Sequence, residues 1–175
     1  MRKILVLAAA TLVAPAASAQ PTGYFDISAV QISELGAPDW GRRVDGNRVL
    51  FLCIDAEKCP PPTAIEVKGV TRAETLPAGF DKGPLSPAFL KQQGEARASN
   101  LGSRFLSAEP YAAGGVRGVA MEASADLGGQ VFFVTRWLGQ GNRLLDIKVT
   151  ARDLAQGRAL AQQAVDRLVP QVFGK

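Results

Sequence analysis

The fold is decided by residues 143–173, which read RLLDIKVTARDLAQGRALAQQAVDRLVPQVF. The side chains in the first part of this stretch alternate between apolar and charged. Every second residue from Leu145 to Val149 is apolar, whereas Asp146 and Lys148 between them are charged. An extended chain points successive side chains to opposite faces, so this pattern predicts a β-strand with one buried face.

The apolar spacing then changes to that of a helix, which we predict over residues 151–169. Thr150 and Asp153 have the spacing of a capping box at its start, with Asp in place of the usual Glu. A sheet and a helix that each have one apolar face bury them against one another, so the helix stripe is expected to be core and not a partner groove. The stripe consists of Leu154, Ala161, Ala164, Val165, Leu168 and Val172.

Upstream of this stretch, glycine-rich turns separate further extended segments. Gly114-Gly115, Gly128-Gly129 and residues 139–142 each offer the positive φ angles that tight hairpins require. The pattern therefore predicts an antiparallel meander. Its four strands cover residues 104–112, 116–126, 130–138 and 143–150.

The N-terminal half is less regular. Residues 48–54 form a nearly continuous apolar run typical of a buried strand, and residues 64–70 alternate like a half-buried one. A short strand is also expected at residues 24–27, and a loop at residues 76–87. After that loop, Ser86 as N-cap and Pro87 at the first helical position predict a helix over residues 86–99. The fold class is therefore α+β, with a meander sheet covered by a long C-terminal helix and a second helix.

The N-terminus has the features of a secretory signal peptide. Arg2 and Lys3 precede an apolar run, and Ala17-Ser18-Ala19 is an A-x-A cleavage site. The apolar run is shorter than the roughly 20 residues that span a bilayer. We therefore expect residues 1–19 to be removed, leaving residues 20–175 as a single domain in the periplasm, or secreted, without a membrane span.

The composition excludes several classes of function. The chain has no histidine, which rules out Ser-His-Asp and Cys-His catalysis and histidine-ligated metal sites. Its 20 Lys and Arg against 16 Asp and Glu are spread evenly, whereas nucleic-acid binding needs clustered cations. No catalytic residue, metal ligand or cofactor is predicted, and nucleic acid is not an expected partner.

The two cysteines, Cys53 and Cys59, are predicted to form a disulfide, because exported chains mature in an oxidising compartment. The alternative is a redox-active dithiol. Such pairs are usually C-x-x-C at a helix N-terminus, and the prolines at residues 60–62 forbid a helix there. Asp55 and Glu57 between the cysteines are two of the several oxygen ligands that Ca²⁺ needs, and a solvated turn is the preferred interpretation.

A candidate partner surface surrounds Trp40. This residue lies in a polar stretch that we interpret as a loop, where an indole ring can contact a partner. Arg42 and Arg43 follow it and could contribute an anion-binding or acidic-partner patch, although isolated arginines usually belong to a solvated surface.

Residues 86–173 resemble the PsbP/Mog1-like families of α/β/α sandwiches. The resemblance lies in the order of helix, antiparallel strands with glycine turns, the strand Leu-Leu-Asp-Ile-Lys-Val-Thr at residues 144–150, and a closing helix that ends Val-Pro-Gln-Val-Phe. It implies a non-catalytic binding or assembly factor. We therefore expect a periplasmic binding or assembly-accessory protein whose partner is an unidentified protein or small molecule. The alternatives are a thiol-redox protein using Cys53 and Cys59 and, less favoured, a carboxylate-based hydrolase.

Overall fold

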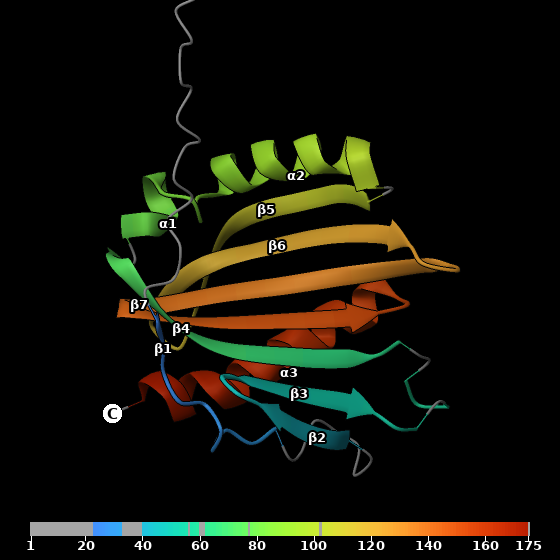
Figure 1. Ribbon diagram of the computed structural model, residues 1–175, viewed down its shortest axis with the longest axis horizontal. Coiled ribbons are helices and arrows are strands. Elements are labelled where there is room, and N and C mark those ends of the chain that lie inside the picture. Colours follow the sequence, from blue (N-terminus) through green and yellow to red (C-terminus); the bar gives the residue numbers. More distant parts are fainter. Residues whose placement is uncertain are drawn as a thin grey trace, which may run out of the picture.

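The computed structural model describes residues 23–32, 40–55, 57–59, 62–76, 78–101 and 103–174 (Figure 1). The predicted signal peptide and its cleavage site lie outside these residues. The elements are, in chain order, β1 (Gly23–Tyr24), β2 (Trp40–Asp45), β3 (Arg48–Cys53), β4 (Ala64–Leu76), α1 (Ala78–Lys82), α2 (Pro87–Leu101), β5 (Ser103–Ala113), β6 (Val116–Asp126), β7 (Gln130–Ala151) and α3 (Leu154–Phe173).

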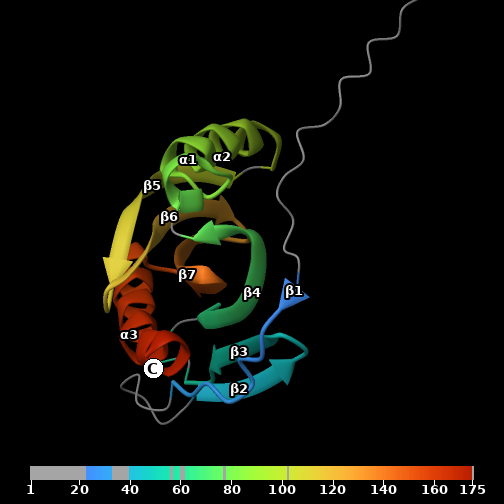
Figure 2. The same cartoon turned by 90° about the vertical axis from the view of Figure 1, so that its left-hand side faces the viewer.

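All strands pair antiparallel in a single sheet of order β2-β3-β4-β7-β6-β5, and β1 pairs with β4 at Val70 and Thr71. Figure 1 shows α3 behind the strands and α2 along the β5 edge, and Figure 2 shows α1 and α2 gathered away from α3. The structure confirms the predicted α+β class, with a meander covered by a long C-terminal helix and a second helix.

The main core lies between α3 and the sheet. Ala161, Ala164, Val165 and Leu168 have no exposed surface, which confirms that the predicted stripe is core. They face sheet residues that are equally buried, among them Val134, Leu138, Leu145, Ile147 and Val149. A smaller cluster on the other face joins α1 and α2 to the sheet, and comprises Val70, Leu76, Phe80, Leu85, Val119 and Leu144.

The boundaries of the closing helix differ from the prediction. Ala151 ends β7, and α3 begins only at Leu154 because Asp153 is the N-cap: its side chain accepts a hydrogen bond of 2.8 Å from the backbone N–H of Gln156. The predicted capping role of Thr150 is therefore wrong. The helix continues past Pro170 to Phe173, since the apolar stripe extends to Val172.

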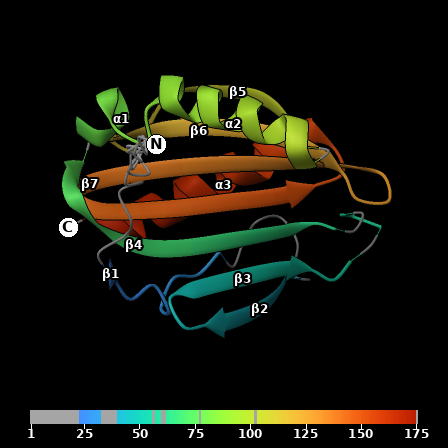
Figure 3. The same ribbon diagram turned by 45° about the horizontal axis from the view of Figure 1, so that its top comes forward.

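The last two predicted strands form one continuous element, β7. A straight strand of this length would span roughly 70 Å at about 3.3 Å per residue. Instead, residues 130–139 pair with β6 and residues 141–150 pair with β4. Figures 1 and 3 show its two arms side by side. Gly141, with φ of 59°, allows the reversal, so the predicted turn is present inside one extended element.

Helix α2 begins as predicted. Pro87 is its first residue, and the Ser86 hydroxyl accepts a hydrogen bond of 3.4 Å from the backbone N–H of Phe89. Gly94 has a low helix propensity, but the packing of α2 against the sheet requires glycine at this position. A Cβ atom at this position would lie 2.3 Å from the ring of Phe105 in β5, so glycine lets α2 approach the sheet.

Three predictions for the N-terminal half need correction. The 48–54 run is buried on one face only: Val49 and Phe51 are core, whereas Leu52 and Ile54 are exposed, since no layer built from the described residues covers the other side of the run there. The predicted loop at 76–87 contains α1, which is anchored by the buried ring of Phe80. The predicted strand at 24–27 is limited to β1.

None of the helices within the described part of the chain is long and apolar enough to cross a membrane.

Candidate functional site

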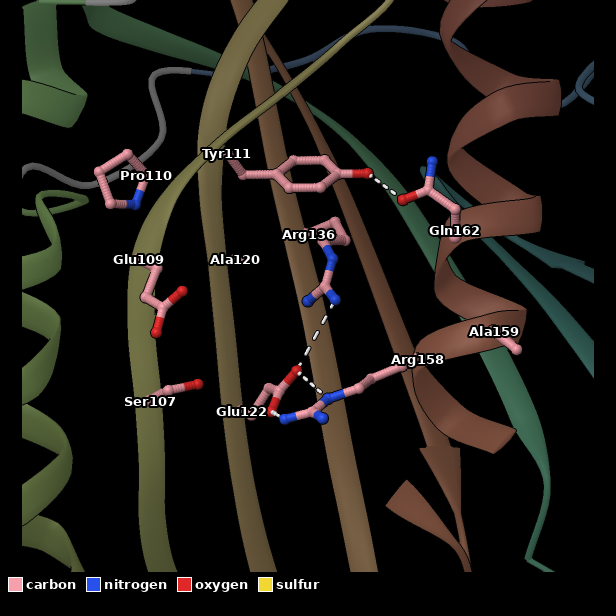
Figure 4. A pocket seen from close by; sticks show the side chains of 10 residues that line it. All are labelled: Ser107, Glu109, Pro110, Tyr111, Ala120, Glu122, Arg136, Arg158, Ala159 and Gln162. Carbon is pink, nitrogen blue, oxygen red and sulfur yellow. Dashed lines mark hydrogen bonds and ion pairs between the residues drawn. The ribbon is translucent and has the colours of Figure 1, made fainter. Parts of the chain in front are cut away.

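A polar groove lies between α3 and the part of the sheet that α3 leaves uncovered, and we call it the α3 groove (Figure 4). Its volume is about 520 Å³, which is the size of a small-molecule or short-segment site. Three strands and one helix contribute side chains to it. The lining residues are Ser107, Glu109, Pro110, Tyr111, Ala120, Glu122, Arg136, Arg158, Ala159 and Gln162.

An irregularity in β5 aims its side chains into the groove. Phe105 pairs with Ala123, but Ser107 pairs with Glu122, so the register shifts between Phe105 and Ser107. Such a bulge reverses the face to which the following side chains point. Phe105 therefore packs against α2 on one side of the sheet, whereas Ser107 and Tyr111 face α3 on the other.

The floor of the groove is a cluster of one carboxylate and two guanidinium groups. Arg158 on α3 binds Glu122 on β6 through two hydrogen bonds, Nε–Oε1 at 2.9 Å and Nη2–Oε2 at 2.6 Å. Arg136 on β7 places its Nη2 3.7 Å from Glu122 Oε1. The hydrogen bonds from Arg158 lower the pKa of Glu122, so its negative charge is maintained at neutral pH.

Arg136 is buried and has spare hydrogen-bonding capacity. Only 8% of the residue is exposed, and its Nη1 donates to the backbone oxygen of Thr135 at 3.0 Å. Its Nε is buried without a hydrogen-bond partner among the described residues. A buried charged donor without an acceptor is costly, because the protein interior does not replace its lost hydration. Arg136 thus retains a donor that no acceptor among the described residues uses.

Tyr111 forms the upper wall. Its ring lies 5.2 Å from the guanidinium carbon of Arg136, in a cation–π arrangement, and its hydroxyl donates to Gln162 Oε1 at 2.7 Å. The Gln162 amide in turn donates to Asp166 at 2.8 Å, which fixes the orientation of that amide. Figure 4 shows Tyr111 and Gln162 pointing toward one another across the groove. Partial burial raises the pKa of Tyr111, so its hydroxyl remains protonated.

Two other cavities lack buried charges. One of about 310 Å³ lies on the opposite side of Pro110, beside the ion pair of Asp81 and Arg117, both of which are more than half exposed. The other, of about 500 Å³, is lined by Arg48 and Asp45, whose side chains are also well exposed. Exposed ion pairs are solvated and contribute little, so the α3 groove is the strongest candidate site.

The structure places Trp40 and Arg42 on one face of the sheet and Arg43 on the other. Trp40 begins strand β2, not the predicted loop, and packs partly buried against the main core. Arg42 donates a hydrogen bond to the backbone oxygen of Ser28. Alternation along β2 directs Arg43 to the opposite face of the sheet.

Cys53 and Cys59 form a disulfide, with their Cα atoms 6.3 Å apart. Cys59 is buried, at 6% exposure. Asp55 organises the loop between the cysteines: its carboxylate accepts hydrogen bonds from the backbone N–H groups of Glu57 and Lys58, at 3.0 and 3.2 Å. The Lys58 ammonium, 2.9 Å away, and these backbone hydrogen bonds lower the pKa of Asp55. The carboxylate oxygens of Asp55 therefore stabilise this turn.

The arrangement in the groove is suited to binding. Its one buried carboxylate is neutralised by two arginines, so it is a poor base, and the groove offers donors and an aromatic face to a ligand. Within the described ranges, no three His, Cys, Asp or Glu side chains are grouped as metal ligands would be.

Sequence reasoning missed Glu122, Arg136 and Arg158. They come from three elements and share no motif. One signal was available: Arg136 lies between Val134 and Leu138 on the same face of its strand, and both of these are core residues. A charged residue at a core-facing position of an alternating strand indicates a partner in the fold or a ligand.

Comparisons with known proteins give no family. No family model matches the chain, and no curated protein matches it. The most similar solved structures include a protein from Bacteroides thetaiotaomicron, at 13% identity and a TM-score of 0.42, which covers 70% of this chain. This chain covers only 40% of that one.

Two further structures match a larger share of both chains. The protein of unknown function PA94 from Pseudomonas aeruginosa has 13% identity and a TM-score of 0.42, covering 75% of this chain and 96% of its own. LpqN, involved in cell envelope biogenesis of Mycobacterium tuberculosis, has 14% identity and a TM-score of 0.34, covering 76% and 83%. None of the three is named as a PsbP or Mog1 protein, and the function has to be argued from the residues of this chain.

Proposed function

We propose that this chain is an exported, periplasmic binding or assembly-accessory protein without catalysis of its own, and that it holds its ligand or partner in the α3 groove. The observation that carries the proposal is Arg136, a buried guanidinium with an unpaired donor that lines an open groove. Structural ion pairs normally satisfy their buried donors, so an unpaired one beside a cavity favours recognition.

Three other observations support export and binding. The signal features of residues 1–19 direct the chain out of the cytoplasm. A disulfide between Cys53 and Cys59 is typical of an oxidising compartment. Cys59 is buried and Cys53 is half-buried, so attack of a thiol at the Cys59 sulfur is hindered, which favours a structural role over redox chemistry. The resemblance to PsbP/Mog1-like proteins remains a proposal about ancestry and agrees with a non-catalytic role.

Export is tested by sequencing the N-terminus of the protein recovered from the periplasm. The sequence should begin at Gln20. Intact Met1 in the membrane fraction would contradict cleavage.

Binding in the groove is tested by photo-cross-linking in the native host. A photoreactive residue replaces Ala159, which is exposed on the groove wall of α3. The matched control replaces Ala78, an exposed alanine at the start of α1 that does not line the groove. We expect a defined adduct from position 159 that is absent from position 78 and is weakened by Arg136→Lys. Equal adducts from both positions, or none from position 159, would contradict the proposal.

A further inference from the structure

From the charges and donors of the α3 groove, we infer that its ligand presents a carboxylate monoanion, which Arg136 receives. This inference rests on the proposed binding role and names the chemistry of the ligand. The carboxylate can belong to a small organic acid or to the C-terminus of a peptide, and the same contact serves both.

The first step is the distribution of hydrogen bonds. Both oxygens of Glu122 are engaged by Arg158, at 2.9 and 2.6 Å, whereas the 3.7 Å separation from Arg136 is too long for a hydrogen bond. Arg136 is therefore held near Glu122 by charge but remains short of acceptors, with its Nε unpaired. A planar guanidinium in this state binds a planar carboxylate well, because the two groups form parallel hydrogen bonds.

The second step is the balance of charge. The groove is lined by two positive groups, Arg136 and Arg158, and by two negative groups, Glu122 and Glu109. Arg158 and Glu109 are exposed, so water screens their charges more strongly than those of buried Arg136 and Glu122. Because the four charges balance, a singly charged carboxylate is the least costly anion to add. A doubly charged phosphate monoester would place twice that charge beside Glu122 and Glu109.

The third step is the space around the anion site. The groove of about 520 Å³ is larger than a carboxylate, so the ligand has a body as well as a charged end. The Ser107 hydroxyl offers a polar contact to that body. A free inorganic anion would leave much of the groove unfilled.

The inference is tested by nuclear magnetic resonance on the purified ¹⁵N-labelled protein, through the Nε–Hε signals of its arginines. The probes are N-acetylalanine and N-acetyl-tetraalanine, each compared with its carboxamide, and methyl phosphate. We expect the Arg136 signal to shift and saturate with the acids, and the amides to bind about tenfold more weakly or worse, since the charged hydrogen bond is lost. If N-acetyl-tetraalanine binds more tightly than N-acetylalanine, the carboxylate belongs to a peptide terminus. If the two acids bind equally, it belongs to a small organic acid.

Variants complete the test. Arg136→Lys keeps the positive charge but removes the Nε donor, and should weaken the acids about tenfold. The matched control is Arg117→Lys, an exposed arginine paired with Asp81 at 2.6 Å, which should leave affinity unchanged. Equal binding of acids and amides, tighter binding of methyl phosphate, or no shift of the Arg136 signal would overturn the inference. A specific adduct at position 159, combined with no shift of the Arg136 signal on addition of the acids, would overturn the inference of a carboxylate ligand. The proposed binding role of the groove would then still stand.

Discussion

Helix α3 carries two neighbouring stripes of side chains that have different roles. One stripe, with Val165 and Leu168, is fully buried against the apolar part of the sheet. The adjacent stripe, with Arg158 and Gln162, faces charged and hydroxyl-bearing residues across an open groove. The apolar stripe stabilises the fold by excluding water. The polar stripe borders a cavity in which Arg136 of β7 has a buried donor without a partner among the described residues. The same helix therefore holds the fold together and presents the candidate site.

The largest difference between the stripes should be in stability. Leu168→Ala removes a fully buried side chain and is expected to lower the free energy of unfolding by about 2–5 kcal/mol. Leu168→Asp should prevent folding, since an unpaired charge would be buried. The matched substitution on the polar stripe is Gln162→Ala, which should cost no more than about 1 kcal/mol. Urea denaturation measures the two alanine variants, and the absence of a urea transition identifies an unfolded Leu168→Asp. Equal losses for Leu168→Ala and Gln162→Ala would show that the two stripes do not differ.

Two carboxylates extend the comparison to the two faces of the sheet. Glu122 faces α3 and its pKa is lowered by Arg158. Its stabilising contribution is complete above its ordinary pKa of 4.5 and is lost as the pH falls through the lower value of the folded state. Asp146 lies on the opposite face, where burial raises its pKa to about 6, despite opposing effects of Lys68 and a hydrogen bond from Trp137.

The folded state should therefore bind the proton of Asp146 more tightly than the unfolded state does. Between about pH 4 and pH 6, rising pH should lower the free energy of unfolding, by about 3 kcal/mol at most. Asp146→Asn should abolish this decrease and make the protein more stable than wild type at pH 7. Denaturation at a series of pH values measures the effect. A wild-type stability that rises steadily over this range, with no gain in Asp146→Asn, would contradict the raised pKa.

The smallest expected effect concerns the disulfide loop, which lies apart from both stripes. Cys53→Ser should lower the free energy of unfolding by about 2 kcal/mol, because the closed loop is short and closure entropy grows slowly with loop length. Non-reducing mass spectrometry should show Cys53 joined to Cys59 in the wild type. The position-159 adduct should be unaffected. Loss of that adduct in Cys53→Ser, with the fold intact, would indicate that the cysteines take part in function.

The sequence predicted those parts of the fold that rest on repeated local patterns. The stripe from Ala161 to Leu168 and the alternation around Ile147 each involve several residues that face one layer, and both were found as expected. Helix α1 was missed because its formation depends on the burial of a single ring, Phe80, in a segment rich in proline and glycine. The exposure of Leu52 was missed because a strand sequence does not reveal which face another layer will cover.

The candidate site could not be assembled from the sequence for a different reason. Tyr111, Glu122, Arg136 and Arg158 are brought together by the β5 bulge and by the placement of α3, both of which depend on the complete sheet. Glu122 and Arg158 taken alone resemble solvated surface, and the core-facing position of Arg136 does not identify its partners. The cysteine pair, by contrast, is close in sequence, and its disulfide was predictable from the export signal expected at residues 1–19.

The central claim is that the charged cluster serves recognition and is not needed for the fold. The double variant Glu122→Leu/Arg136→Met replaces the buried charges with apolar side chains, and leaves Arg158, which is 55% exposed, to be solvated. Such replacements are often neutral or stabilising, so its free energy of unfolding should fall by no more than about 1 kcal/mol. The decisive measurement is its photo-adduct at position 159. We predict that the folded double variant loses this adduct; a folded double variant that retains it at the wild-type yield would contradict the claim.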